Sequence, residues 1–167
     1  MSEQKKADQV RLLEGILPLA REHKLPVVIH CRDEAQSREA TSVCMKVMQA
    51  LLPDDQRVHL HCFDGDVSTM QDWLKLFPQA VFGLTSLALK EENKDRMERV
   101  VEKIPLQKIL LETDSPYLVP PRLRRASKHS NPGMITEIAN FVASVKNMPV
   151  RLVYEVAFSV TECFYNL

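Results

Sequence analysis

The 167-residue sequence has few of the cysteines that stabilise small secreted or zinc-binding proteins. It has four cysteines, Cys31, Cys44, Cys62 and Cys163, and no two of them form a Cys-x-x-Cys pair. This number is too small for a disulfide scaffold, and the spacing excludes a zinc-finger pattern. We therefore expect a protein of a reducing compartment, the cytoplasm or the nucleus.

The sequence also lacks a long apolar run and a net charge. No segment reaches the ~18 apolar residues of a membrane span, and the first eight residues are too polar for a signal peptide. We expect no membrane association. Because 22 Lys and Arg balance 22 Asp and Glu, the protein has no net charge that would attract a charged partner from a distance.

The composition is that of a globular protein, with 45% hydrophobic and 26% charged residues. A chain of this size can bury roughly 70% of its unfolded surface, so we expect one domain over residues 1–167.

Four short apolar runs predict strands, and helical periodicity separates them. The expected strands are 27–30, 58–61, 80–84 and 109–114, and the expected helices are 8–23, 40–51, 67–77, 97–104, 132–142 and 149–164. Strand starts about 20 to 30 residues apart indicate βα units and a parallel sheet. The fold class is therefore α/β, with about four parallel strands and flanking helices. This is roughly half of a (β/α)8 barrel, which typically takes about 250 residues.

Three of these strands end in side chains that can bind a metal, namely His30, His61 and Asp114. The carboxyl ends of parallel strands lie on one rim, so we expect the three to converge. Imidazole and carboxylate ligands suit a divalent ion such as zinc or manganese. The alternative is local: a strand-end His can bond a carbonyl, and an Asp before Ser-Pro can cap a turn.

Residues beside these positions have simpler explanations. His59 shares a strand face with His61 but lies one layer deeper, and a buried core histidine is the preferred interpretation. Cys31 and Cys62 each follow a candidate ligand and are expected to face the helices rather than to act as nucleophiles.

The long loop from Leu118 to Asn131 contains four basic residues and no acid. They are Arg122, Arg124, Arg125 and Lys128. Such a cluster beside a metal rim could hold phosphate oxygens, although a solvated surface loop is the alternative. Arg32 could add a phosphate contact, or it could pair with Asp33 or Glu34.

Four motifs in series closely resemble the TatD family of metal-dependent deoxyribonucleases. They are Pro-Val-Val-Ile-His-Cys-Arg at 26–32, His-Cys-Phe-Asp-Gly at 61–65, Leu-Glu-Thr-Asp-Ser-Pro-Tyr-Leu at 111–118 and Asn-Pro at 131–132. The resemblance implies a TIM-barrel hydrolase of the amidohydrolase type that cleaves DNA phosphodiester bonds.

The resemblance also implies roles for individual residues. His30, His61 and Asp114 match the family's metal ligands, and Glu112 matches a motif residue beside the site. The complete site would hold two divalent ions (Mg, Mn or Zn) that activate a water, with Asp114 taking its proton. Arg32 and the loop residues Arg124 and Arg125 would position DNA, either single-stranded or at its 3' ends.

Part of the family pattern is missing. No Asp-x-His-x-His strand and no strand with the bridging Glu precede Pro26, and Asp64 stands where Ser or Thr is usual. The chain thus resembles the C-terminal two-thirds of a TatD domain. Open barrel edges seek partners, so we expect self-association and weak metal binding.

Three functions are compatible with these features. The first is a metal-dependent nuclease that is complete only in a longer or assembled form. The second is a catalytically inactive, truncated TatD-like fragment or isoform that acts through protein association. The third is a related barrel hydrolase of a small cyclic amide or ester, against which the basic loop argues.

Overall fold

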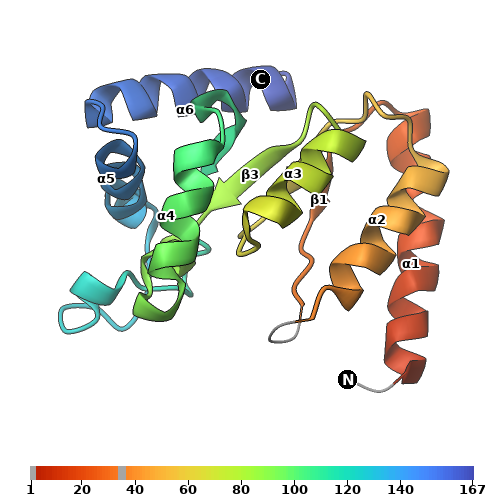
Figure 1. Ribbon diagram of the computed structural model, residues 1–167, viewed down its shortest axis with the longest axis horizontal. Coiled ribbons are helices and arrows are strands. Elements are labelled where there is room, and N and C mark those ends of the chain that lie inside the picture. The colour runs from red at the N-terminus through yellow and green to blue at the C-terminus, as the bar shows by residue number, and fades with distance from the viewer. Residues whose placement is uncertain (1–2, 34–36) are drawn as a thin grey trace.

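Four short apolar segments form the strands of one parallel sheet, in the order β1-β2-β3-β4, of which Figure 1 labels β1 and β3. The computed structural model describes residues 3–33 and 37–167. The strands are β1 Val27–Ile29, β2 Val58–Leu60, β3 Val81–Leu84 and β4 Ile109–Leu111. All four expected strands and their parallel pairing are confirmed. Strand β4 ends before the expected Asp114, where a φ of 54° turns the chain.

Helices connect the strands and follow the last of them. They are α1 Glu3–Glu22, α2 Glu39–Leu51, α3 Val67–Leu76, α4 Lys94–Lys103, α5 Ile135–Val145 and α6 Val150–Tyr165. Helix α1 begins five residues before the expected Asp8 and continues through Pro18. The sequence pattern does not predict the 3-10 turns Ser86–Leu89 and Glu91–Asn93 between β3 and α4.

Side chains cap two of the helical segments at their first turns. The Asp66 carboxylate accepts a hydrogen bond from the Thr69 N–H at 2.7 Å, which caps α3. The Asn131 side chain accepts from the Gly133 N–H at 3.0 Å. This second cap begins a 3-10 turn, Pro132–Met134, that leads into α5.

One face of the sheet packs against α2, α3 and α4 and forms the main core. Alternate strand residues point to opposite faces. The residues that point to these helices are buried: Val27, Ile29, Val58, Leu60, Phe82, Leu84 and Ile109. Trp73 on α3 and Val100 on α4 are among the side chains that they meet.

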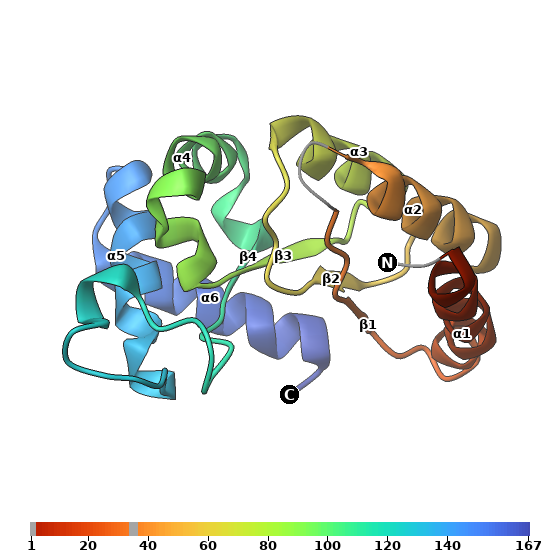
Figure 2. The same cartoon turned by 90° about the horizontal axis from the view of Figure 1, so that it is seen from below.

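Helix α6 covers part of the other face. Figure 2 shows it crossing the strands on the side opposite α2 and α3. Its Phe164 forms a second buried cluster with Val81 and Leu110. His59 lies on this second face, because it pairs in register with Val81. The sheet is therefore enclosed on both sides near its centre, and β1 and β4 are its edges.

No helix within residues 3–33 and 37–167 has both the length and the hydrophobicity that a bilayer span requires.

Candidate metal centre

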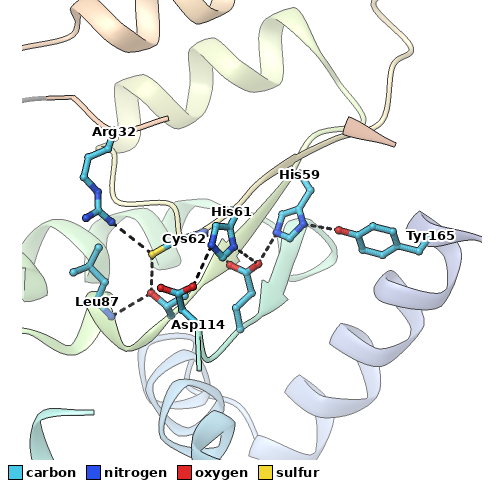
Figure 3. Close-up of polar contacts among 9 residues, drawn as sticks. Arg32, His59, His61, Cys62, Leu87, Asp114 and Tyr165 are labelled. Carbon is cyan, nitrogen blue, oxygen red and sulfur yellow. Dashed lines mark hydrogen bonds and ion pairs between the residues drawn. The ribbon is translucent and has the colours of Figure 1, made fainter. Parts of the chain in front are cut away.

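The carboxyl ends of β1, β2 and β4 bring the three expected side chains together at one rim. The imidazole rings of His30 and His61 have their centroids 5.3 Å apart. The Nε2 atom of His61 lies 3.5 Å from Oδ1 of Asp114 (Figure 3). His61 is thus the central member of the set. His30 is exposed and Asp114 is partly exposed, so both are accessible from solvent.

Glu112 holds His61 in place. Its Oε1 lies 2.8 Å from Nδ1 of His61, and its Oε2 accepts the backbone N–H of Cys62 at 2.9 Å. Burial of the carboxyl by itself raises the pKa of Glu112, but the nearby His59 and the hydrogen bonds from His61 and the Cys62 N–H outweigh burial and leave the pKa below its ordinary value. The ionised carboxylate therefore fixes the Nδ1–H tautomer of His61 and leaves Nε2 free as a metal donor.

Gly83 on β3 makes room for this carboxylate. A Cβ atom at this position would lie 1.9 Å from Oε2 of Glu112 and 2.6 Å from Nε2 of His59. These distances are far inside van der Waals contact. The sequence analysis missed Gly83, and the signal available was a glycine inside a strand, which often marks a close approach.

His59 is buried, as expected, but it is also connected to the site. Its Nδ1 lies 2.6 Å from the hydroxyl of Tyr165 on α6. Its Nε2 is buried and lies 3.0 Å from Oε1 of Glu112, although the two are not aligned as a hydrogen bond. Figure 3 shows Tyr165, His59, His61 and Asp114 in one line. Nothing in the local sequence relates Tyr165 to residues 106 positions away.

Two residues at the rim have left-handed backbone conformations. The φ angles of Cys62 and Asp114 are 50° and 54°. Such a conformation costs a residue with a Cβ roughly 1–2 kcal/mol. At Cys62 it directs the N–H to Glu112, and this hydrogen bond offsets the cost. Backbone strain therefore occurs where the functional side chains meet.

Cys62 is buried, but its thiol lies near the rim, where Nη2 of Arg32 is 3.7 Å from Sγ, instead of facing the helices as expected. Its Sγ lies 3.2 Å from Oγ1 of Thr85. Burial raises the pKa of the Cys62 thiol, so it stays protonated near neutral pH and is a poor nucleophile. Cys31 is half-buried and packs against the main core.

Arg32 pairs with Asp64 rather than with Asp33. Its Nε lies 3.4 Å from Oδ2 of Asp64, and Nη2 lies 3.7 Å from Sγ of Cys62. Asp33 instead accepts the N–H of Ala40 at 2.8 Å and the Thr41 hydroxyl at 2.5 Å, and so supports the start of α2. Glu34 lies outside the described residues. The unusual Asp64 therefore has a partner in Arg32, which orients the guanidinium at the rim.

A cleft of about 310 Å³ opens beside His61, between the first turns of α2 and α3. Its lining combines the acids Asp33, Asp64 and Asp66 with Arg38 and Arg96. The core residues Ile29, Leu60 and Trp73 also line the cleft, so it joins polar and apolar surface beside His61.

The basic loop begins and ends beside Asp114. The Ser130 N–H donates to the Pro116 carbonyl at 2.9 Å, which ties the two ends of the loop together. The Tyr117 N–H donates to the Asp114 carbonyl at 2.9 Å. Arg124 and Arg125 are exposed, and neither forms an ion pair within the described residues. Their charges are therefore available to a ligand.

The donor chemistry of the rim fits a divalent ion. It offers two imidazoles and a carboxylate, and the contact of His61 with Glu112 is the usual support of a metal-bound histidine. Within residues 3–33 and 37–167, however, no three His, Cys, Asp or Glu side chains are gathered closely enough to hold an ion. The rim therefore offers suitable donor types without a complete set of ligands among these residues.

Comparison with known proteins assigns these residues to a family. A family model described as TatD related DNase matches residues 1–166. The 3'-5' RNA nuclease TATDN2 of Homo sapiens is 30% identical over 161 residues, which make up 96% of this chain and 20% of that protein. The 3'-5' ssDNA/RNA exonuclease TatD of Klebsiella pneumoniae (strain 342) is 34% identical over 139 residues, or 82% of this chain and 50% of that protein. The chain therefore spans only a part of each relative.

A solved structure shows the same fold. The crystal structure of YJJV, a TATD homolog from Escherichia coli K12, superposes with a TM-score of 0.80 at 20% identity, over 100% of this chain and 60% of that chain. This likeness confirms the expected α/β fold with four parallel strands and flanking helices.

Proposed function

Because the chain belongs to the TatD related DNase family, we propose that it takes part in metal-dependent hydrolysis of DNA phosphodiester bonds. The observation that carries this proposal is the arrangement of His61. Its Nδ1 contacts the Glu112 carboxylate at 2.8 Å, and its Nε2 faces Asp114 at 3.5 Å. This is the arrangement of a supported metal-binding histidine with a carboxylate at the open side.

The family implies use of divalent metal, and His30, His61 and Asp114 would hold the ion in this chain. A bound Mg, Mn or Zn ion would lower the pKa of a water and offset charge on a phosphate. Glu112 keeps His61 oriented through Nδ1. Asp114, being partly exposed, is placed to accept a proton from an attacking water. The complete family site would use two ions.

We propose single-stranded DNA, cut from its 3' end, as the substrate. The bacterial relative is named as acting on ssDNA and RNA from the 3' end. Arg124 and Arg125 are exposed on a loop tied at Pro116 and Ser130, and Arg32 is oriented by Asp64. Guanidinium groups at these positions suit phosphate oxygens on both sides of the rim.

The activity can be tested on end-labelled oligonucleotides with added Mg²⁺, Mn²⁺ or Zn²⁺. DNA and RNA strands labelled at the 3' or the 5' end distinguish substrate and direction. We expect Asp114→Asn and His61→Ala to abolish cleavage. The control is His23→Ala, an exposed histidine near the end of α1. Equal cleavage by the wild type and Asp114→Asn would refute the proposal.

A second function has its own support: a catalytically inactive protein that acts through association. The described residues gather no three-ligand set, and the chain spans 50% of the bacterial relative. Val28 in the middle of the edge strand β1 is 52% exposed. An exposed apolar edge favours pairing with a second copy of the chain.

Light scattering on size-exclusion fractions tests this association. We expect dimers or larger species for the wild type and a shift to monomer for Val28→Lys, because a charge on an edge strand opposes pairing. The control is Leu152→Lys on α6, where the side chain is 42% exposed and far from β1 in sequence. A monomeric wild type would exclude this mode of association.

We propose the cytoplasm or the nucleus as the location. All four cysteines are free, as a reducing compartment would require.

A further inference from the structure

The last turn of α6 reaches the metal rim through a line of polar contacts. The Tyr165 hydroxyl lies 2.6 Å from Nδ1 of His59, and Nε2 of His59 lies 3.0 Å from Oε1 of Glu112. The same Oε1 lies 2.8 Å from Nδ1 of His61. These contacts join residues from β2, the segment after β4 and α6 (Figure 3).

The protons on this line have one consistent arrangement. The ionised Glu112 carboxylate can only accept, so Nε2 of His59 carries the hydrogen that faces it, and Nδ1 has a lone pair that accepts from the Tyr165 hydroxyl. That N–H then faces the carboxylate of Glu112, as the N–H of His61 does. The reversed His59 tautomer would place a lone pair against the carboxylate, which repels it. By donating to Nδ1, the Tyr165 hydroxyl stabilises the tautomer in which His59 attracts Glu112.

The last turn of α6 is held firmly enough to perform this role. Arg57, just before β2, donates through Nη1 to the Phe164 carbonyl at 2.5 Å and through Nη2 to the Lys24 carbonyl at 3.1 Å. Phe164 is buried against Val81 and Leu110. The helix ends at Asn166, which has a left-handed φ of 56°.

The contact between His59 and Glu112 is shielded from solvent. His59 is 5% exposed, and its Nε2 has no other partner among the described residues. The Glu112 carboxylate lies in the space that Gly83 leaves open, where a Cβ atom would be 1.9 Å from its Oε2. Buried polar groups act strongly on one another when water does not screen them.

We infer that His59 and Tyr165 are positioning residues, which hold Glu112 and thereby the orientation and tautomer of His61. This inference rests on the proposed metal-binding role of His61. It also gives the C-terminal turn of α6 a function. Through Tyr165, the packing of this turn affects how well His61 is oriented to bind a metal ion.

The decisive variant is Tyr165→Phe, which removes one oxygen atom and keeps the ring. Its matched control is Tyr154→Phe on the same helix, where the hydroxyl has no hydrogen bond within the described residues. The first readout is the side-chain ¹⁵N spectrum of metal-free protein at one mildly alkaline pH. We expect a single Nδ1–H tautomer of His61 in the wild type and in Tyr154→Phe, and a mixture in Tyr165→Phe.

The second readout is the dissociation constant for Mn²⁺, measured by calorimetry. Loss of groups that support a metal-bound histidine weakens binding by 10- to 100-fold, and we expect about tenfold for Tyr165→Phe. His59→Gln, which keeps a polar side chain but not the geometry, should weaken Mn²⁺ binding at least as much.

The two proposals can fail separately. If wild-type protein binds no Mn²⁺, the metal site is refuted, and the tautomer of His61 still decides whether Tyr165 positions it. If Tyr165→Phe lowers only the unfolding midpoint, with the His61 tautomer and Mn²⁺ affinity unchanged, the contacts are purely structural and the inference is overturned.

Discussion

The Nδ1 atom of His61 lies 2.8 Å from Oε1 of Glu112, and this contact determines which nitrogen of His61 faces the rim. A histidine that donates through Nδ1 to a carboxylate presents a basic Nε2 with little rotational freedom. Exposed His30 has no such support within the described residues. The two expected histidine ligands are therefore unequal, and His61 should dominate metal binding.

Glu112→Gln should weaken Mn²⁺ binding by about tenfold or more. The carboxylate presents two acceptor oxygens to the N–H groups of His59, His61 and Cys62, whereas the amide of Gln presents one. Calorimetric titration measures the change. The control is Glu98→Gln on α4, which lies outside the site, and an unchanged affinity in Glu112→Gln would show that His61 needs no carboxylate partner.

Gly83→Ala should destabilise the protein by roughly 2 kcal/mol or more, since the new methyl group and the Glu112 carboxylate cannot occupy the same space. Urea denaturation measures the loss. The matched control is Gly15→Ala in α1, where a Cβ meets nothing within 4 Å. That variant should gain up to about 1 kcal/mol from helix propensity. Similar effects at both glycines would contradict the close approach at β3.

Asp66→Asn should remove a pH-dependent part of the stability. The backbone N–H of Thr69, followed by its side chain, lowers the pKa of Asp66 below its ordinary 3.8. A carboxyl with a lowered folded-state pKa stabilises the fold above the unfolded-state pKa, and this contribution disappears as the pH falls through the folded-state value.

Wild-type protein should therefore be more stable than Asp66→Asn near neutral pH, by about 0.5 kcal/mol, because a charged cap also interacts with the helix dipole. The gap should close below pH 3.8. Thermal unfolding between acid and neutral pH measures it. Asp55→Asn, in the exposed turn before β2, serves as control. A gap that persists in acid would exclude the charge as its cause.

The double variant Arg124→Ala and Arg125→Ala should weaken binding of single-stranded DNA and reduce its salt dependence. Each phosphate contact adds about 0.7 to the slope of log affinity against log salt for single strands, so the slope should fall by about 1.4. Fluorescence anisotropy at several salt concentrations measures this. If binding and slope do not change, the loop is a solvated surface, and a small uncharged amide or ester becomes the better substrate class.

The strands and the rim were predictable because their signals are local. Runs such as Val27–Ile29 are apolar and bounded by polar residues, and parallel pairing follows from the spacing between them. The rule that strand ends share a rim then places His30, His61 and Asp114 together without any knowledge of contacts. The pairing of Arg32 with Asp64 was not foreseen, because the backbone after β1 directs Asp33 to α2 instead.

The sequence by itself determined the strands and their parallel direction, the helices between them and the identity of the rim residues, since these depend on periodicity and on motifs within a few residues. Only the tertiary structure decided that α6 crosses the second face of the sheet and brings Tyr165 to His59. It also decided that Gly83 provides the space for Glu112. Both depend on side-chain packing between segments far apart in the chain, and such packing leaves no periodic trace in the sequence.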